Sequence, residues 1–212
     1  MENLRTHLAG KRHLIWDWNG TLLDDVDAVV EVIGEILTSQ GMARVNREQY
    51  RAIFGFPIIN YYRRLGFDFE KVPFETLSTA FVDGYRSRVL EIPLHAGAKE
   101  LLAALQAEGF QQSVLSAAKE DDLRMHLELH GITSHFDHIY GLNDHHAVSK
   151  VQRGRELIAD TGIDVKSTLL IGDTDHDLEV GRELGVEVLL LGDGHQTYER
   201  LSAVHGRVLQ IR

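Results

Sequence analysis

Apolar positions along the chain follow two kinds of spacing, and each kind occupies its own part of the sequence. Outside residues 23–92, short apolar runs alternate with longer segments whose apolar positions recur at helical spacing. The short runs predict strands at residues 14–16, 111–115, 138–140, 168–171 and 186–191. The longer segments predict helices at residues 96–108, 119–130, 150–161 and 175–184, most of them ended by glycine. Because strands that alternate with helices pair in parallel through right-handed crossovers, we predict an α/β fold with a doubly wound parallel sheet.

Residues 23–92 show helical spacing and little strand-like alternation. Four helices are predicted there, beginning near residues 26, 46, 58 and 73. Ten of the fourteen Phe and Tyr residues of the chain lie between Tyr50 and Tyr85, and we expect most of them to form a core. We therefore predict a Rossmann-like α/β core made of residues 1–22 and 93–212. An all-helical cap, residues 23–92, is inserted after the first strand.

Composition narrows the possible partners and the location. The net charge of −10 disfavours nucleic acid and anionic membranes, which attract basic surfaces. The absence of cysteine excludes disulfides and thiolate chemistry, and it is typical of a cytoplasmic protein. No apolar run is long enough for a membrane span, and residues 1–12 have no signal-peptide core, so we expect no membrane association. The oligomeric state cannot be predicted from these features.

Candidate chemistry is found where the predicted strands end. Asp17 follows the first strand, Ser116 follows the strand at 111–115, and Asp173 follows the strand at 168–171. Lys150 begins the helix before that last strand. The carboxyl ends of parallel strands share one edge of a sheet, which is where such folds bind ligands.

Three carboxylates, Asp173, Asp175 and Asp177, fall within five residues after the strand at 168–171. Such crowding is unfavourable unless a cation lies among them, and carboxylate oxygens are suited to Mg²⁺. An acid-rich helix N-terminus is the other interpretation, because the helix dipole favours negative charge there. Asp175 fits that second interpretation, whereas Asp173, directly at a strand end, fits the metal interpretation better.

Taken together, these motifs resemble a known family. Asp17-Trp18-Asn19-Gly20-Thr21, Ser116, Lys150 and the segment 172–177 are similar, in order and spacing, to the four motifs of the haloacid dehalogenase-like hydrolase superfamily. The resemblance covers essentially the whole chain and is greatest to phosphoglycolate-phosphatase-like members with a helical cap.

The resemblance implies a role for each motif residue. Asp17 would be the nucleophile that forms an aspartyl-phosphate, Ser116 would donate a hydrogen bond to a phosphoryl oxygen, and Lys150 would neutralise phosphoryl charge. Asp17, Asp173 and the backbone carbonyl of Asn19 would bind Mg²⁺. The supporting residues would be Asp177, which holds Lys150 or a metal-bound water, and Thr21, which holds the loop and lies near the phosphoryl group. Ala117, beside Ser116, completes the predicted phosphoryl-binding set.

Asn19 departs from the family pattern, because phosphatases of this superfamily usually carry an Asp there as general acid and base. An amide cannot transfer that proton, although its backbone carbonyl remains available to a metal. Three explanations stay open: a substrate with a good leaving group, another proton carrier such as His176, or a chain with little turnover.

The cap is predicted to supply substrate contacts through Phe56 and Arg63. The segment Phe54-Gly55-Phe56-Pro57 and the arginines Arg63 and Arg64 could reach over the strand ends, since an Arg can bind a second anionic group. The alternative, which we favour slightly, places both arginines on a solvated helix face.

Most of the twelve histidines are expected to be surface residues. His135, His138 and the segment Asp144-His145-His146 lie near one strand, but their spacing does not resemble that of a zinc site. His176 lies within the acidic motif, and His195, in the loop after the last strand, is a weaker candidate for the site.

These observations predict a Mg²⁺-dependent phosphohydrolase that cleaves a small phosphorylated metabolite through an aspartyl-phosphate on Asp17. The alternative is a phosphate-binding or regulatory member of the fold with little turnover, because Asn19 replaces the usual acid.

Overall fold

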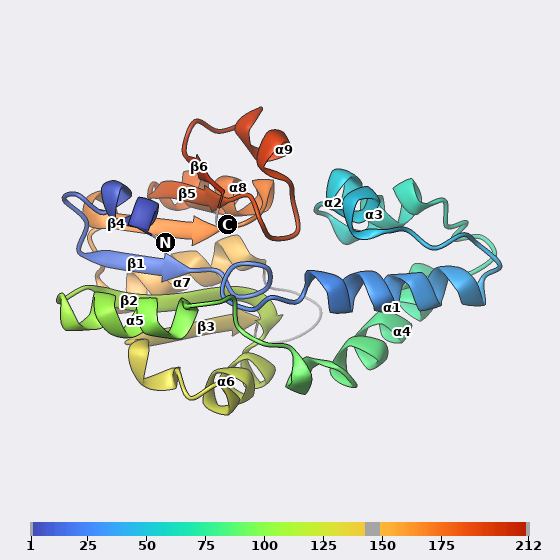
Figure 1. The fold of residues 1–212 in the computed structure, drawn as a ribbon, viewed down its shortest axis with the longest axis horizontal. Helices are drawn as coiled ribbons and strands as arrows, with labels where there is room; N and C mark the ends of the chain where they lie inside the picture. Colours follow the sequence, from blue (N-terminus) through green and yellow to red (C-terminus); the bar gives the residue numbers. More distant parts are fainter. Residues whose placement is uncertain (1, 143–148, 211–212) are drawn as a thin grey trace.

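The computed structural model of the protein describes residues 2–142 and 149–210. Its centre is one parallel sheet with the strand order β3-β2-β1-β4-β5-β6. In chain order the strands are β1 (His13–Trp16), β2 (Gln111–Lys119), β3 (His138–Leu142), β4 (Thr168–Gly172), β5 (Glu187–Leu191) and β6 (Val208–Leu209). Figure 1 shows the sheet with its strands pointing toward the helices that follow β1. The predicted doubly wound parallel α/β fold is therefore confirmed.

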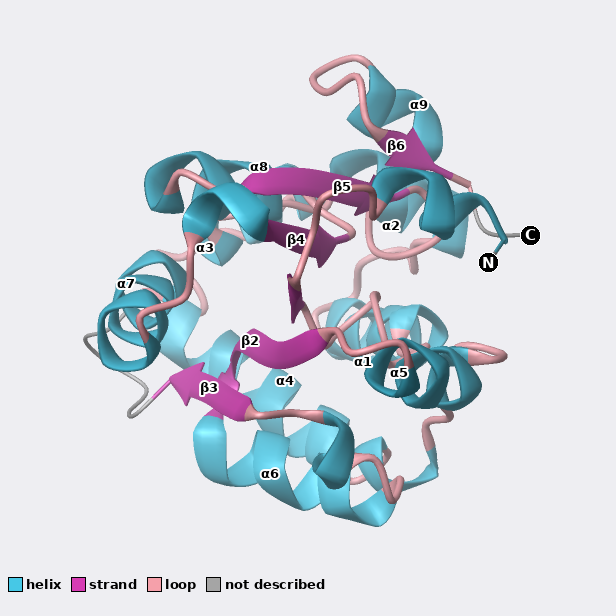
Figure 2. Ribbon diagram, turned by 90° about the vertical axis from the view of Figure 1, so that its left-hand side faces the viewer, coloured by secondary structure: helices cyan, strands magenta, loops and turns pink. Residues whose placement is uncertain are grey.

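Helices cover both faces of the sheet. The helices α5 (Ala98–Ala107) and α6 (Glu120–Leu129) lie on one face, and α7 (Lys150–Thr161) and α8 (Asp175–Leu184) lie on the other (Figure 2). Successive residues of a strand point to opposite faces of the sheet and pack against different helices. Leu14 and Trp16 belong to the apolar cluster with α5 and α6, whereas Ile15 belongs to the cluster with α7 and α8. This alternation follows from the period of two residues along a strand, and it explains why β1 is buried on both faces.

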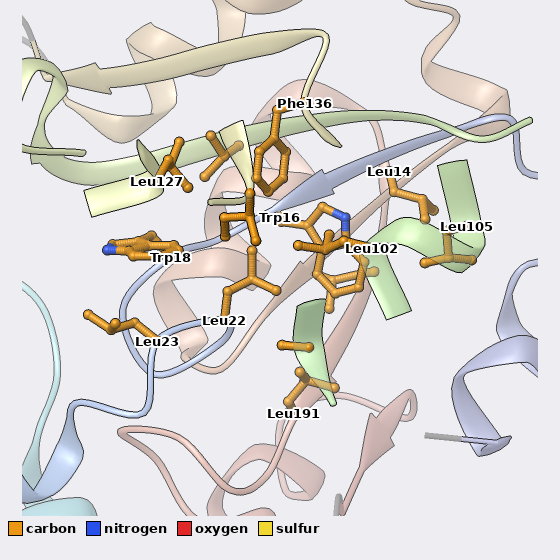
Figure 3. Packing of buried hydrophobic residues seen from close by; sticks show 14 of the residues in the cluster. Leu14, Trp16, Trp18, Leu22, Leu23, Leu102, Leu105, Leu127, Phe136 and Leu191 are labelled. Carbon is orange, nitrogen blue, oxygen red and sulfur yellow. The ribbon is translucent and has the colours of Figure 1, made fainter. Parts of the chain in front are cut away.

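The cluster on the α5–α6 face is the larger of the two and reaches the edge of the sheet. Trp16 lies within it, close to Leu102, Leu105 and Phe136 (Figure 3). The Trp16 indole N–H donates a hydrogen bond of 3.0 Å to Gln112 Oε1, so its polar group is satisfied inside the core. The loop that carries the candidate chemistry begins directly after this anchored residue.

All elements between residues 26 and 91 are helical. They are α1 (Val26–Ser39), α2 (Arg47–Ile53), α3 (Ile58–Leu65), α4 (Phe74–Arg86) and a 3₁₀ turn at Val89–Glu91. Their buried side chains form a separate apolar cluster that contains Tyr50, Tyr61 and Tyr62. The chain leaves and re-enters the sheet through adjacent segments, where the Asp24 N–H donates to the Pro93 carbonyl over 3.0 Å. The domain limits at residues 22 and 93 stay a prediction.

Several boundaries differ from the predicted ones. The strand β2 continues to Lys119 instead of ending before Ser116, but its pairing with β3 shifts register between Leu115 and Lys119. The sequence did not predict the short elements α9 (Tyr198–Ser202) and β6, nor the 3₁₀ segments Glu2–His7, Thr133–His135 and Val165–Ser167. Elements of two to six residues are too short to show a period. In the described part of the chain, no helix has the length and apolar character needed to cross a membrane.

Candidate active site

Two acidic residues are placed side by side because the strands that precede them are neighbours. β1 pairs with β4 so that Trp16 lies opposite Ile171, and the Asp17 N–H donates to the Ile171 carbonyl over 2.8 Å. Asp17 and Asp173 therefore emerge from the same edge of the sheet, and both are buried. The turn after Asp17 needs Gly20, which has φ +74° and lies so close to Asp173 that a Cβ would overlap its carboxylate.

Lys150 joins two of the carboxylates. It is the first residue of α7, whose N-terminus is capped by the Ser149 side chain. Its Nζ donates to Asp17 Oδ1, and to Asp177 Oδ1 over 2.5 Å. Burial alone would lower the pKa of Lys150, but the charges of Asp17 and Asp177 raise that pKa above its ordinary value. The ammonium group is therefore a fixed positive charge at the bottom of the site.

Asp177 is held by the start of α8. Its Oδ2 accepts hydrogen bonds from the Thr174 hydroxyl at 2.7 Å and from the Thr174 N–H at 3.0 Å. Burial opposes ionisation of this carboxyl, but Lys150 and these hydrogen bonds lower its pKa. Since both of its oxygens have protein partners, Asp177 orients Lys150.

The remaining two carboxylates have too little compensating charge. Burial raises the pKa of Asp17, and it raises the pKa of Asp173 well above the ordinary range. The Thr21 hydroxyl lies between them, 3.0 Å from Asp173 Oδ1 and 3.3 Å from Asp17 Oδ2. Carboxylate oxygens of Asp17, Asp173 and Asp177 lie within 4.8 Å of one another. A buried, oxygen-only cluster with an uncompensated charge fits a hard divalent cation.

Ser116 belongs to β2, the strand that pairs with β1. It is buried within the irregular part of β2, and its Oγ accepts a hydrogen bond of 3.0 Å from the Ala118 N–H. Ser116 and Ala117 both line the cavity described below.

Asn19 is engaged with a carboxylate that the sequence analysis missed. The Asn19 Nδ2 donates to Asp25 Oδ2 and to the Tyr85 hydroxyl, both at 2.8 Å. Tyr85 in turn donates to Asp25 Oδ2 over 2.8 Å, and the Gly20 N–H donates to Asp25 Oδ1 over 2.8 Å. Asp25 precedes α1 but makes no capping bond to it. Its carboxylate is turned toward the Asn19 loop instead.

His195, the weaker histidine candidate, completes this buried network. Its ring Nε2 lies 3.2 Å from Asp25 Oδ1, and its ring Nδ1 lies 2.8 Å from the Tyr50 hydroxyl. The backbone N–H of His195 donates to Asp173 Oδ2 over 2.6 Å. Burial alone would lower the pKa of His195, but the charge of Asp25 raises it to about 9. The same ion pair lowers the pKa of Asp25 against the effect of burial.

The helices of residues 26–91 are attached to the loop that contains His195. Arg51 Nη2 donates to the carbonyls of Gly192 at 2.5 Å and Gln196 at 3.0 Å. The Phe54 carbonyl accepts from Gln196 and from Arg200. No pattern in the sequence predicted these contacts, which join segments about 140 residues apart.

A cavity of about 490 Å³ lies above the carboxylates. It is lined by Asp17, Asn19, Ser116, Ala117, Lys150 and Asp173, and also by Phe56 and His176. The Phe56 and His176 rings are in contact, with 4.6 Å between their centroids, and His176 Nδ1 lies 3.0 Å from Glu179. The structure thus brings together nearly all of the predicted site residues around one cavity.

Two predicted site residues are not among the described residues that line the cavity: Thr21, whose hydroxyl bonds Asp17 and Asp173, and Arg63. Among the described residues that line the cavity, neither Arg63 nor Arg64 is found. The Arg63 guanidinium bonds Asn60 and lies 5.5 Å from the Phe69 ring centroid, while Arg64 bonds the Ile53 carbonyl. This geometry does not support the predicted substrate contact of Arg63.

The other histidines singled out in the sequence lie elsewhere. His135 bonds Gln106, and the His138 ring is stacked on His13 at 6.4 Å. The segment Asp144-His145-His146 lies outside the described residues.

With the geometry in place, comparison with known proteins identifies the family. The family model for haloacid dehalogenase-like hydrolases matches residues 14–191. The chain therefore belongs to this family, and the resemblance drawn from the motifs is confirmed.

Individual relatives are phosphatases by name. The chain is 25% identical to a Dickeya dadantii protein named Probable phosphatase IndB over 201 residues, 92% of this chain and 87% of the relative. It is 25% identical to the phosphoglycolate phosphatase of Aquifex aeolicus over 189 residues, 84% of each chain. A haloacid dehalogenase-like family hydrolase from Streptococcus pneumoniae has the same fold, with a TM-score of 0.81 at 17% identity over 94% of both chains. These likenesses support a phosphatase-type hydrolase and give no support to the low-turnover alternative.

Proposed function

We propose that the protein is a Mg²⁺-dependent phosphatase that cleaves phosphate monoesters of small metabolites through an aspartyl-phosphate on Asp17. The proposal depends mainly on one observation, the buried group in which Lys150 bridges Asp17 and Asp177 while Asp173 lies beside them. Phosphoryl transfer needs in-line positioning and neutralised charge. Lys150 contributes a positive charge to this group, and the end of β1 holds Asp17 at a fixed position.

The donor set fits the metal. Asp17, Asp173 and the backbone carbonyl of Asn19 would hold Mg²⁺, all of them hard oxygen ligands at one sheet edge. The bound ion would supply positive charge to the phosphoryl oxygens and would favour the ionised forms of Asp17 and Asp173. Asp177 is already used by Lys150 and Thr174, so we assign it to the support of Lys150.

Asp17 acts as the nucleophile. One of its carboxylate oxygens bonds to phosphorus while the bond from phosphorus to the ester oxygen breaks, and the leaving group departs with the electron pair. Lys150, the Ser116 hydroxyl and the backbone at Ala117 bind the phosphoryl oxygens during this transfer. Water then bonds to the phosphorus of the aspartyl-phosphate while the bond from phosphorus to the Asp17 oxygen breaks, which restores the Asp17 carboxylate; the proton that the water loses leaves with the released phosphate or passes to solvent. Thr21 keeps the Asp17 loop in register with Asp173.

Contacts from the cap set the choice of substrate. Phe56 lies on the cavity wall and is proposed to contact the part of the substrate beyond the phosphate. A role for Arg63 stays a prediction, and Arg63→Ala tests it: an unchanged KM for every substrate removes Arg63 from the site. His176 also lines the cavity, where its ring contacts Phe56 and its Nδ1 lies 3.0 Å from Glu179; transfer of a proton by His176 stays a prediction. A cytoplasmic location likewise stays a prediction.

The test is phosphate release from a panel of phosphate monoesters, with Mg²⁺ and with EDTA. We expect Mg²⁺-dependent release by the parent and none by Asp17→Asn, which keeps the shape of the side chain but lacks the nucleophile. Acid quenching followed by mass spectrometry should find the phosphoryl group on the Asp17 peptide. Release that survives Asp17→Asn would refute the mechanism, and release in EDTA would refute the role of the metal.

A further inference from the structure

The wall of the cavity that faces the carboxylates is apolar. Side chains from α1, α4, the 3₁₀ turn at Val89–Glu91 and the segment after α2 contribute to it, among them Val29, Phe54, Phe56, Phe81, Val82 and Leu90. The charged groups Asp17, Lys150 and Asp173 lie at the sheet edge that forms the other side of the cavity. A ligand that places a phosphate on Lys150 therefore places the rest of its structure against apolar and aromatic side chains.

Polar groups on the cap side of the cavity are already paired within the protein. The Tyr85 hydroxyl donates to Asp25, and the Tyr50 hydroxyl lies 2.8 Å from His195. Arg86, at the rim, forms an ion pair of 3.2 Å with Asp122.

Lys119, the other rim cation among the described lining residues, forms a 3.0 Å ion pair with Asp121. A substrate carboxylate or sugar hydroxyl that binds at these groups would have to displace their partners, which costs binding energy. Among the described residues that line the cavity, His126 has an unpartnered polar atom, Nδ1, on the α6 side.

Large apolar side chains are also left exposed where the cavity opens. Phe56, Leu90 and Met125 line the cavity and are 39%, 56% and 46% exposed. They are three of the six exposed large hydrophobic residues in the described part of the chain. Apolar surface gathered at a binding cavity is stabilised when an apolar ligand covers it.

Asn19 restricts the leaving group of the substrate, and this restriction is independent of the apolar wall. Its amide is not acidic enough to protonate a leaving oxygen, and its N–H groups already donate to Asp25 and Tyr85. A phenol has a pKa of about 10, whereas that of an alcohol is close to the value of about 15.7 for water. An aryl oxide can therefore leave without an acid in the site, and an alkoxide cannot leave easily.

We propose that the site is built for aryl phosphates, the phosphate monoesters of phenols and related aromatic hydroxyl compounds. This inference rests on the proposed phosphatase function. An Asp17 oxygen bonds to phosphorus, the bond from phosphorus to the aryl oxygen breaks, and the aryl oxide leaves with the electron pair and takes its proton from water. The aromatic ring lies against the apolar wall, and hydrolysis of the aspartyl-phosphate completes the cycle.

Three substrates separate the two parts of the proposal. Phenyl phosphate has the apolar ring and the good leaving group, benzyl phosphate has the ring but an alkoxide leaving group, and phosphoglycolate has neither. With Mg²⁺ we expect kcat/KM for phenyl phosphate to exceed that for benzyl phosphate by about tenfold or more. Its advantage over phosphoglycolate should be about a hundredfold or more.

Each other outcome has one meaning. If kcat/KM for phosphoglycolate equals that for phenyl phosphate, the inference is wrong while the proposed function stands. Equal kcat/KM for phenyl and benzyl phosphate overturns the aryl assignment. If no ester is cleaved, the proposed function itself fails.

Two exposed residues of α6 provide a matched pair of variants. Met125 lines the cavity, whereas Leu129, one turn further and 53% exposed, is not among the described residues that line it. For 1-naphthyl phosphate, Met125→Ser should lower kcat/KM on the order of fivefold, since it removes part of the apolar contact. Leu129→Ser should leave kcat/KM unchanged. Because both side chains are exposed, folding is not at stake, and equal effects of the two variants would refute the apolar contact.

Discussion

The hydrogen bond between Asn19 and Asp25 determines what happens when the usual acid is restored. In Asn19→Asp, a carboxylate replaces the amide whose Nδ2 lies 2.8 Å from Asp25 Oδ2. Two charged carboxylates about 3 Å apart repel each other by about 5–6 kcal/mol at an effective dielectric constant of about 20. The pair can avoid this by taking up one proton. At pH 7 that costs about 4 kcal/mol for a group with an ordinary pKa of about 3.9.

Proton uptake costs less free energy than the repulsion of two charged carboxylates, so it sets the expected loss of stability. We predict that Asn19→Asp lowers the free energy of unfolding by about 4 kcal/mol at pH 7. The shared proton has a raised pKa in the folded state, so its stabilising contribution is present at low pH and is lost as the pH rises. The deficit should therefore shrink by about 1.4 kcal/mol for each pH unit between 7 and 5.

Exchanging the amide and the carboxylate between residues 19 and 25 should remove the repulsion. In Asn19→Asp/Asp25→Asn, the amide lies at residue 25 and can donate to the new carboxylate at residue 19. We expect a coupling energy of about 2 kcal/mol or more between the two positions. The double variant also gains a carboxylic acid beside the nucleophile. Its kcat/KM for benzyl phosphate should exceed that of Asp25→Asn by at least about tenfold.

Urea denaturation followed by tryptophan fluorescence measures the stabilities, since Trp16 and Trp18 are both buried. Mass spectrometry must first show that the parent carries the amide, because an Asn-Gly sequence can deamidate. If Asn19→Asp is as stable as the parent from pH 5 to 8, the two carboxylates at residues 19 and 25 do not repel each other as predicted. The same conclusion follows if the double variant is no more stable than the single one.

Three further predictions concern the metal site, a buried histidine and the attachment of the cap. Asp173→Asn should raise the melting temperature without metal, because it removes a buried charge with a raised pKa, and should abolish stabilisation by Mg²⁺. Burial lowers the pKa of His13, which bonds Ser113, to about 4. Its stabilising effect is complete above pH 6.5 and is lost as the pH falls toward 4, by at most about 3 kcal/mol, and NMR titration of its ring measures this pKa. Arg51→Met should cost about 1–3 kcal/mol in urea denaturation, since two hydrogen bonds to buried carbonyls are lost.

Each of these has a clear contrary result. An unchanged thermal shift by Mg²⁺ in Asp173→Asn would remove that residue from the metal site. A pKa near 6.5 for His13 would show that its ring is hydrated. For the cap, Arg63→Met is the matched control, because Arg63 is exposed and should matter by less than about 0.5 kcal/mol. Equal losses in the two arginine variants would show that Arg51 has no special role.

Much of the site follows from local patterns in the sequence. Each functional residue of the predicted motifs lies at or near the end of a strand or the start of a helix. Once the strands are known to be parallel, their carboxyl ends must share one edge of the sheet. The sequence therefore placed Asp17 beside Asp173 and brought Ser116 and Lys150 near them, as the structure shows.

Other features depended on the tertiary structure alone. Asp25 looks like an ordinary acid before a helix, and only the folded chain turns it toward Asn19, Tyr85 and His195. Arg51 likewise reads as a polar residue of a short helix, although it binds carbonyls about 140 residues away.

Local features could be predicted and distant contacts could not, because the two depend on interactions that span different distances along the chain. Hydrophobic period and glycine stops are properties of neighbouring residues, so they could be read from the sequence and were enough to predict the elements and the sheet edge where the chemistry lies. The partners of Asn19 are Asp25, just before α1, and Tyr85 of α4, and Asp25 in turn meets His195 from the loop after β5. Their meeting depends on how helices pack against a sheet edge. A polar side chain carries no sign of its distant partner, and only packing decided which groups were buried together.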